Sequence, residues 1–232
     1  MTMTVPHPLS KKELALQALR NLLIGFVLLS ALFFLTAGTF RYWEAWLYLA
    51  VLFVPISLFF VYLINNAPDL LERRLRMRER EKTQGWITGV AGIIMLLAFI
   101  IPGLDKRFGW SSVPPWVVIV ADLVFLTGYG IFVIVLRENH YASRLIEVER
   151  DQKVISTGPY ARVRHPMYVA VLLMYMASPL ALGSFWAVLP TFLLPIILIA
   201  RIQTEEIALK RDLQGYEAYT QQVRYRLIPG IW

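Results

Sequence analysis

The chain has 232 residues, of which 57% are hydrophobic and only 17% are charged, and its formal net charge is +7. A soluble domain is usually about 45–50% apolar and about 25% charged, so this composition argues against a soluble protein and for a bilayer as the solvent. The sequence has no cysteine, which excludes disulfides, thiolate metal ligands and a cysteine nucleophile.

Apolar residues gather in long runs, which we expect to be membrane helices. The runs cover roughly residues 20–39, 44–64, 86–102, 114–136, 167–182 and 185–200. The first, second and fourth are near the ~20 residues that a helix needs to cross a bilayer. The last two are shorter and are joined only by Gly183-Ser184, which predicts a tight helical hairpin. The sequence therefore predicts an all-α, polytopic membrane protein with about six transmembrane helices.

We divide the chain into a four-span membrane region, residues 1–136, and a C-terminal region, residues 137–232. The second region would hold a cytoplasmic loop, the helical hairpin and a C-terminal helix and tail. The first apolar span is expected to remain as an anchor, because no cleavage site follows a short apolar core.

Basic residues are distributed unevenly between the two sets of connections. Of the 23 Lys and Arg residues, only Arg41, Lys106 and Arg107 fall outside the set that includes both chain ends. Basic connections stay in the cytoplasm, so both termini are expected there. Basic residues beside apolar spans suit membrane lipids and argue against nucleic acid. The histidines, His7, His140 and His165, show no metal-ligand spacing, so we expect no metal.

Three residues inside the fourth span stand out. Asp122 is ionisable at membrane depth, which makes it a candidate functional residue, although a hydrated or hydrogen-bonded structural role is the favoured interpretation. Gly128 and Gly130 would permit close helix packing.

A polar stretch, residues 157–168, interrupts the apolar pattern before the fifth span. Pro166 suits the first turn of a helix, which places His165 at the helix start. A helix N-terminus favours an anion, and Arg164 and His165 add donors there. Tyr168 can share a face with His165. This entrance is therefore suited to a carboxylate or a phosphate.

A second polar group follows the sixth span. Arg201 and Glu205 are four residues apart and face one way on a helix. In a hairpin they would lie beside Arg164 and His165, and together they would suit a zwitterion such as an amino-acid moiety. A plainer interpretation is that Arg164-His165-Pro166 only supplies cytoplasmic positive charge and a proline that starts a helix. Arg201 and Glu205 would then be an ion pair on the surface of a helix.

Several blocks in residues 140–232 resemble the isoprenylcysteine carboxyl methyltransferase family, in its bacterial and archaeal form. The blocks are Gly158-Pro159-Tyr160, Arg164-His165-Pro166-Met167-Tyr168, Arg201 with Glu205-Glu206-Ile207-Ala208-Leu209, Gly215-Tyr216-Glu217-Ala218-Tyr219 and Ile228-Pro229-Gly230. The resemblance implies an integral-membrane methyltransferase that uses S-adenosylmethionine in a cytoplasmic C-terminal pocket. Its substrate would be a lipid-like or prenylated molecule or protein tail.

The resemblance also implies roles for particular residues. Arg201 would contact the acceptor, Arg164 would bind a substrate or cofactor carboxylate, and Glu206 is a further candidate for catalysis. The cofactor would be lined by Gln152, Lys153, Val154, Ile155, Tyr160, His165, Pro166, Met167, Tyr168 and Glu205. Weaker candidates are Tyr219, Arg224 and Glu147.

The acceptor stays open at this point: a prenylcysteine carboxylate, a phospholipid amine, a thiol or another lipid acid would each serve. One alternative reaction is reduction by an NADPH-dependent sterol-type membrane reductase, which can also carry Arg-His-Pro-x-Tyr. The paired Glu205-Glu206 favours the methyltransferase. A membrane protein without enzymatic activity is the remaining alternative, and it would predict more polar residues inside the spans.

Overall fold

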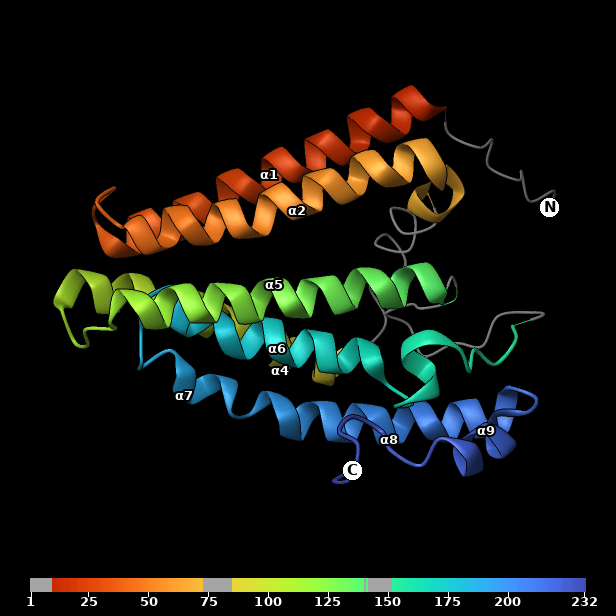
Figure 1. Ribbon diagram of the computed structural model, residues 1–232. Coiled ribbons are helices and arrows are strands. Elements are labelled where there is room, and N and C mark those ends of the chain that lie inside the picture. The colour runs from red at the N-terminus through yellow and green to blue at the C-terminus, as the bar shows by residue number, and fades with distance from the viewer. Residues whose placement is uncertain (1–9, 73–84, 140, 142–151) are drawn as a thin grey trace.

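The long helices of the protein lie side by side along a common axis (Figure 1). The structure is a computed structural model that describes residues 10–72, 85–139, 141 and 152–232. Over these residues it contains helices and no strand: α1 (Lys11–Ala37), α2 (Trp43–Asn66), α4 (Gly85–Phe108), α5 (Pro115–Glu138), the short 3₁₀ helix η2 (Gly158–Ala161), α6 (Pro166–Ala181), α7 (Val188–Thr191), α8 (Leu194–Asp212) and α9 (Tyr216–Gln222). The expected all-α fold is confirmed.

Four of these helices are long and apolar enough to cross a membrane: α1, α2, α5 and, from residue 89 onward, α4. Helix α6 is apolar but shorter, at 16 residues. Helix α1 begins well before the apolar run expected at residue 20, because Ser10 and Glu13 form a capping box ahead of it. The protein is thus a polytopic membrane protein built on four long helices and a shorter fifth.

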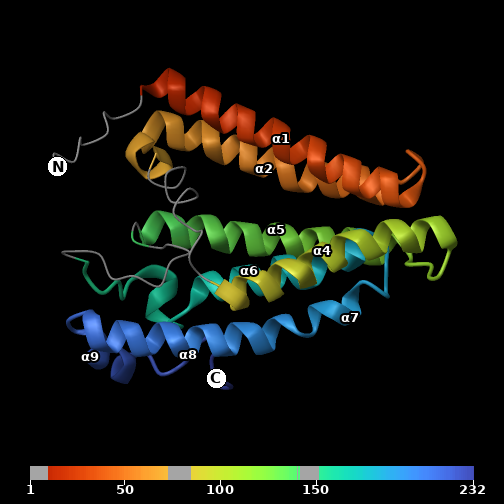
Figure 2. The same ribbon diagram turned by 180° about the vertical axis from the view of Figure 1, so that it is seen from behind.

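The sixth expected span, residues 185–200, is not one helix, and that prediction is wrong. It is divided into α7 and the first part of α8. Pro190 and Pro195 have no backbone N–H to donate, so a regular helix is hard to continue past them. Helices α6 and α8 nevertheless run in opposite directions, and the hairpin arrangement brings the start of α6 near the second half of α8 (Figures 1 and 2).

Close approaches of the backbone hold the bundle together. A Cβ atom on Gly128 of α5 would lie 2.9 Å from the carbonyl oxygen of Ala170 in α6, so only glycine fits. Gly130 has open space, so the expectation of close packing is confirmed for Gly128 and wrong for Gly130. A cluster of buried side chains joins α1, α2 and α5, with Phe33, Tyr48 and Phe125 among its members.

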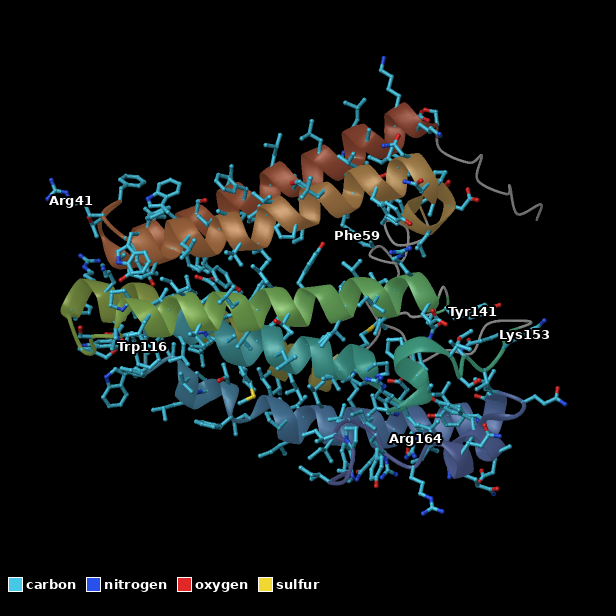
Figure 3. The ribbon with its side chains drawn as sticks, in the orientation of Figure 1. Arg41, Phe59, Trp116, Tyr141, Lys153 and Arg164 are labelled. Atoms are coloured by element: carbon cyan, nitrogen blue, oxygen red, sulfur yellow. The ribbon has the colours of Figure 1, made fainter. Side chains whose placement is uncertain are left out.

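The two ends of the bundle differ in composition. One end, here called the aromatic end, carries exposed rings beside the connections from α1 to α2, α4 to α5 and α6 to α7: Phe40, Trp43, Trp46, Phe108, Trp110, Trp116, Phe185 and Trp186. Arg41 and Trp116 lie there, whereas Tyr141, Lys153 and Arg164 lie toward the opposite, basic end (Figure 3). Exposed tryptophans of this kind are typical of a membrane–water interface.

A buried carboxylate fastens the aromatic end. Asp105, which is 1% exposed, accepts hydrogen bonds from the Ser111 hydroxyl and the Ser184 hydroxyl, both at 2.5 Å. The Lys106 ammonium donates to Glu44 at 3.1 Å beside it. These contacts tie the end of α4 to α2 and to the loop after α6. At the basic end, other polar side chains of α6 and α8 contact one another.

Candidate functional site

The start of α6 is positioned by the chain that follows α9. Pro166 occupies the first turn of α6 and His165 is its N-cap. The backbone N–H of Arg164 donates to the Tyr225 carbonyl, and that of His165 to the Arg226 carbonyl, both at 2.9 Å. The residues before α6 are therefore held to residues 225–226 by two backbone hydrogen bonds.

Glu206 of α8 is the centre of a buried charged cluster. Its Oε1 atom accepts from Arg164 Nε at 2.7 Å and lies 3.2 Å from His165 Nε2. Its Oε2 atom accepts from Arg226 Nε at 2.9 Å. Arg164 also donates from Nη1 to the carbonyls of Val223 and Arg224, at 2.8 and 2.7 Å. Arg164 and Glu206 are 7% and 4% exposed, so both groups are desolvated as well as paired.

The charge state of Glu206 follows from these contacts. Burial alone would raise the pKa of its carboxyl, but hydrogen bonds from His165 and Arg164, together with their positive charge, lower the pKa to about 2. Glu206 is therefore ionised at neutral pH and compensates the arginines around it.

Glu205, the neighbouring residue, belongs to a different and more accessible group. Its Oε2 atom accepts a hydrogen bond from the Tyr168 hydroxyl at 2.6 Å, and the same hydroxyl accepts from Arg201 Nε at 2.9 Å. The Glu205 side chain is 27% exposed, and its Oε1 lies 3.9 Å from His165 Nδ1. Glu205, Tyr168, Arg201 and His165 form a mixed-charge cluster, here called the mouth cluster, at the basic end of α6 and α8.

The segment before η2 lies beside α9. Val154 packs against a cluster of buried side chains made by Leu213, Tyr216, Tyr219 and Val223. The Tyr219 hydroxyl donates to the Tyr160 carbonyl at 2.7 Å, and Asn139 donates to the Tyr160 hydroxyl at 2.9 Å. These contacts bring Val154 and Tyr160 against the candidate Tyr219 of α9.

The other expected site residues are placed as follows. Pro166 is buried at the start of α6 and Met167 is half-buried beside it. Gln152 and Ile155 are half-buried, and Lys153 is exposed at the basic end, apart from Arg164 (Figure 3). Arg224 is exposed. Glu147 lies outside the described residues.

Two features were not anticipated from the sequence. Arg226 was not singled out, and its pairing with Glu206 has no local signal because Glu206 lies 20 residues earlier in the chain, in α8. The role of Arg164 is also more constrained than expected, since its N–H groups donate to three acceptors.

Asp122 is 4% exposed and lies within α5, and neither of its carboxylate oxygens has a hydrogen-bond partner among the described residues.

Comparison with known families bears on what this arrangement does. The family model for phospholipid methyltransferases matches residues 116–214. The match runs from α5 through α8 and includes every residue of the mouth cluster, although it covers less than half of the chain. It indicates a membrane methyltransferase of the broad class to which isoprenylcysteine methyltransferases also belong. No curated protein matches the chain.

Proposed function

We propose that the protein transfers a methyl group from S-adenosylmethionine to a lipid-like acceptor in the membrane. The observation that carries the proposal is the convergence of Tyr168, Arg201 and Glu205 beside His165, inside the region matched by the phospholipid methyltransferase family. The family match also favours a methyltransferase over the sterol-type reductase.

The mouth cluster fits the amino-acid end of the cofactor. That end carries an ammonium, and the cluster offers it the partly exposed carboxylate of Glu205. Glu205 is partly exposed, so it can exchange Tyr168 for a ligand without breaking a buried pair. Arg164 is committed to Glu206 and to backbone carbonyls, so we assign both residues to holding His165 and the C-terminal segment in place.

Little acid–base chemistry is required of the chain. S-adenosylmethionine supplies a methyl group that is already electrophilic because it is bonded to a sulfonium sulfur. The residues of the site would hold the acceptor near that methyl group and exclude water. Arg201, a half-buried member of the cluster, would orient a carboxylate or phosphate of the acceptor.

Two acceptors suit this site. A phospholipid amine is favoured by the family match; its neutral form would accept the methyl group, the cofactor would leave as the thioether, and the proton of the methylated nitrogen would pass to water. A prenylcysteine carboxylate is the alternative, favoured by the order of the sequence blocks, and it needs no proton transfer. We place the basic end, both chain termini and the site in the cytoplasm, on the distribution of Lys and Arg.

The direct test uses purified protein in vesicles with methyl-labelled S-adenosylmethionine. One set of vesicles contains phosphatidylethanolamine, a second contains only phosphatidylcholine, and a third adds a farnesylated cysteine to phosphatidylcholine. Label in the first set alone supports the amine acceptor, and label in the third alone supports the carboxylate. Absence of S-adenosylmethionine binding, combined with binding of NADPH, would overturn the methyltransferase in favour of the reductase.

A further inference from the structure

The C-terminal segment, residues 223–232, turns back along α8 after α9. In both views the C-terminus lies beside α8 and not beyond the end of the bundle (Figures 1 and 2). The backbone pairing of Arg164 and His165 with residues 225 and 226 fixes its level. Because Pro166 opens the apolar helix α6 directly after His165, this level is where apolar helix begins, at the membrane boundary.

The segment is a closed loop. The backbone N–H groups of Arg226, Leu227 and Ile228 all donate to the Trp232 carbonyl oxygen, at 2.9, 3.0 and 3.2 Å. The Arg226 guanidinium lies 5.0 Å from the centre of the Trp232 ring and also pairs with Glu206. Leu227 is buried. The inward side of the loop is therefore fixed to α8 and to the start of α6.

The outward side of the loop is apolar. Ile228 is 51% exposed and Ile231 is 77% exposed, and the side chain of Tyr225, whose carbonyl accepts from Arg164, is 40% exposed. Arg224 is exposed next to them. Helix α8, to which Arg226 ties the loop, also exposes the apolar side chains of Ile196 and Ile199 ahead of Arg201. A rigid loop with two exposed isoleucines beside a membrane-facing helix is poorly suited to water.

We propose that this loop is seated in the membrane at the basic end of the bundle, with Ile228 and Ile231 inserted at the boundary between headgroups and acyl chains. Surface-seated apolar groups reach roughly 5–10 Å into that boundary. The exposed Arg224 complements anionic headgroups. The occupant of the apolar face is thus lipid, and the loop links the bilayer surface to the Glu206 cluster beneath the mouth cluster. This inference concerns the loop itself and does not rest on the proposed reaction.

The absence of cysteine makes the test simple, because a single cysteine can be placed and labelled with a fluorophore sensitive to polarity. Ile231→Cys is the test variant. Ala218→Cys, exposed on α9, is the control for water, and Ile196→Cys, 64% exposed on α8, is the control for lipid. Each labelled protein is placed in vesicles of phosphatidylcholine and phosphatidylglycerol that contain nitroxide lipids labelled at a shallow or a deep acyl position. Gel filtration confirms that each variant is folded.

The Ile231 probe is expected to emit at shorter wavelength than the Ala218 probe and to be quenched more by the shallow nitroxide lipid than by the deep one. An Ile228→Cys probe should behave in the same way. Emission and quenching equal to those of the Ala218 probe would overturn the proposal. The proposal would also be overturned if the probe emitted at shorter wavelength but was not quenched by nitroxide lipids, and if it self-quenched as the protein-to-lipid ratio rose. A second copy of the chain would then cover the loop.

Discussion

Arg164 and Glu206, 42 residues apart in the chain, meet at 2.7 Å in a place where neither is exposed to water. The pair joins the start of α6 to the second half of α8, and Arg226 adds the C-terminal loop to the same carboxylate. Glu205, one residue earlier, faces the accessible mouth cluster instead. Because Glu206 is buried among arginines and Glu205 is partly exposed, we assign a structural role to Glu206 and the contact with a ligand to Glu205.

Glu206→Gln should destabilise the protein by about 3 kcal/mol, because removing one partner of a buried ion pair leaves the other charges uncompensated. Thermal unfolding in a mild detergent measures the change. Asp212→Asn is the matched control, since Asp212 pairs with Arg211 on the exposed surface and should matter little. Equal effects of the two substitutions would contradict the central role given to Glu206.

Stability should fall in acid through the same carboxylate. The pKa of Glu206 is lowered from 4.5 to about 2 in the folded protein, so its contribution is complete above pH 4.5 and is lost as the pH falls toward 2. Chemical unfolding at a series of pH values between 6 and 2 measures this loss. Glu206→Gln should flatten that part of the curve, and a curve unchanged by the substitution would assign the acid sensitivity to other groups.

Gly128→Ala should destabilise the bundle, because the new Cβ would meet the Ala170 carbonyl at 2.9 Å and force α5 away from α6. Gly130→Ala is the control, with open space around it, and should leave stability unchanged or raise it by up to about 1 kcal/mol through better helix propensity. Unfolding of both variants in detergent makes the comparison. If Gly130→Ala were the more damaging, the packing of α5 on α6 would need revision.

Gly128 and Gly130 also show which part of the helix packing the sequence does not predict. Hydropathy was enough to predict the long helices, because a bilayer demands runs of about 20 apolar residues. It could not tell which face of α5 meets α6, since residues two apart point to nearly opposite sides of a helix. The break between α7 and α8 was missed because the apolar run continues through Pro190 and Pro195.

The site divides in the same way. Spacing and the hairpin prediction together placed Tyr168, Arg201 and Glu205 near His165, and the structure brings those residues together. Spacing could not reveal that Arg164 would be taken up by Glu206 and the carbonyls of Val223 and Arg224. Such partners are set by how distant segments pack, and Arg226 carried no local sign of its role.

Glu205→Gln should weaken binding of S-adenosylmethionine by about 10- to 100-fold, the usual value of a hydrogen bond to a charged group. The substitution keeps the size of the side chain and removes the charge that would face the cofactor's ammonium. Calorimetry on purified protein measures the affinity. Glu217→Gln, on the exposed surface of α9, is the control. Unchanged affinity in Glu205→Gln with normal folding would move the cofactor away from the mouth cluster.

Arg201→Ala should lower turnover more than it lowers affinity for the cofactor, because we assign Arg201 to the acceptor. Turnover is measured with the acceptor identified by labelling, and affinity by calorimetry on the same preparation. Arg201→Lys keeps the positive charge but loses the planar fork that holds a carboxylate or phosphate through paired hydrogen bonds, so it should recover cofactor affinity fully and turnover only in part. The opposite pattern, a larger loss of affinity than of turnover, would assign Arg201 to the carboxylate of S-adenosylmethionine and leave the acceptor to be held by other residues.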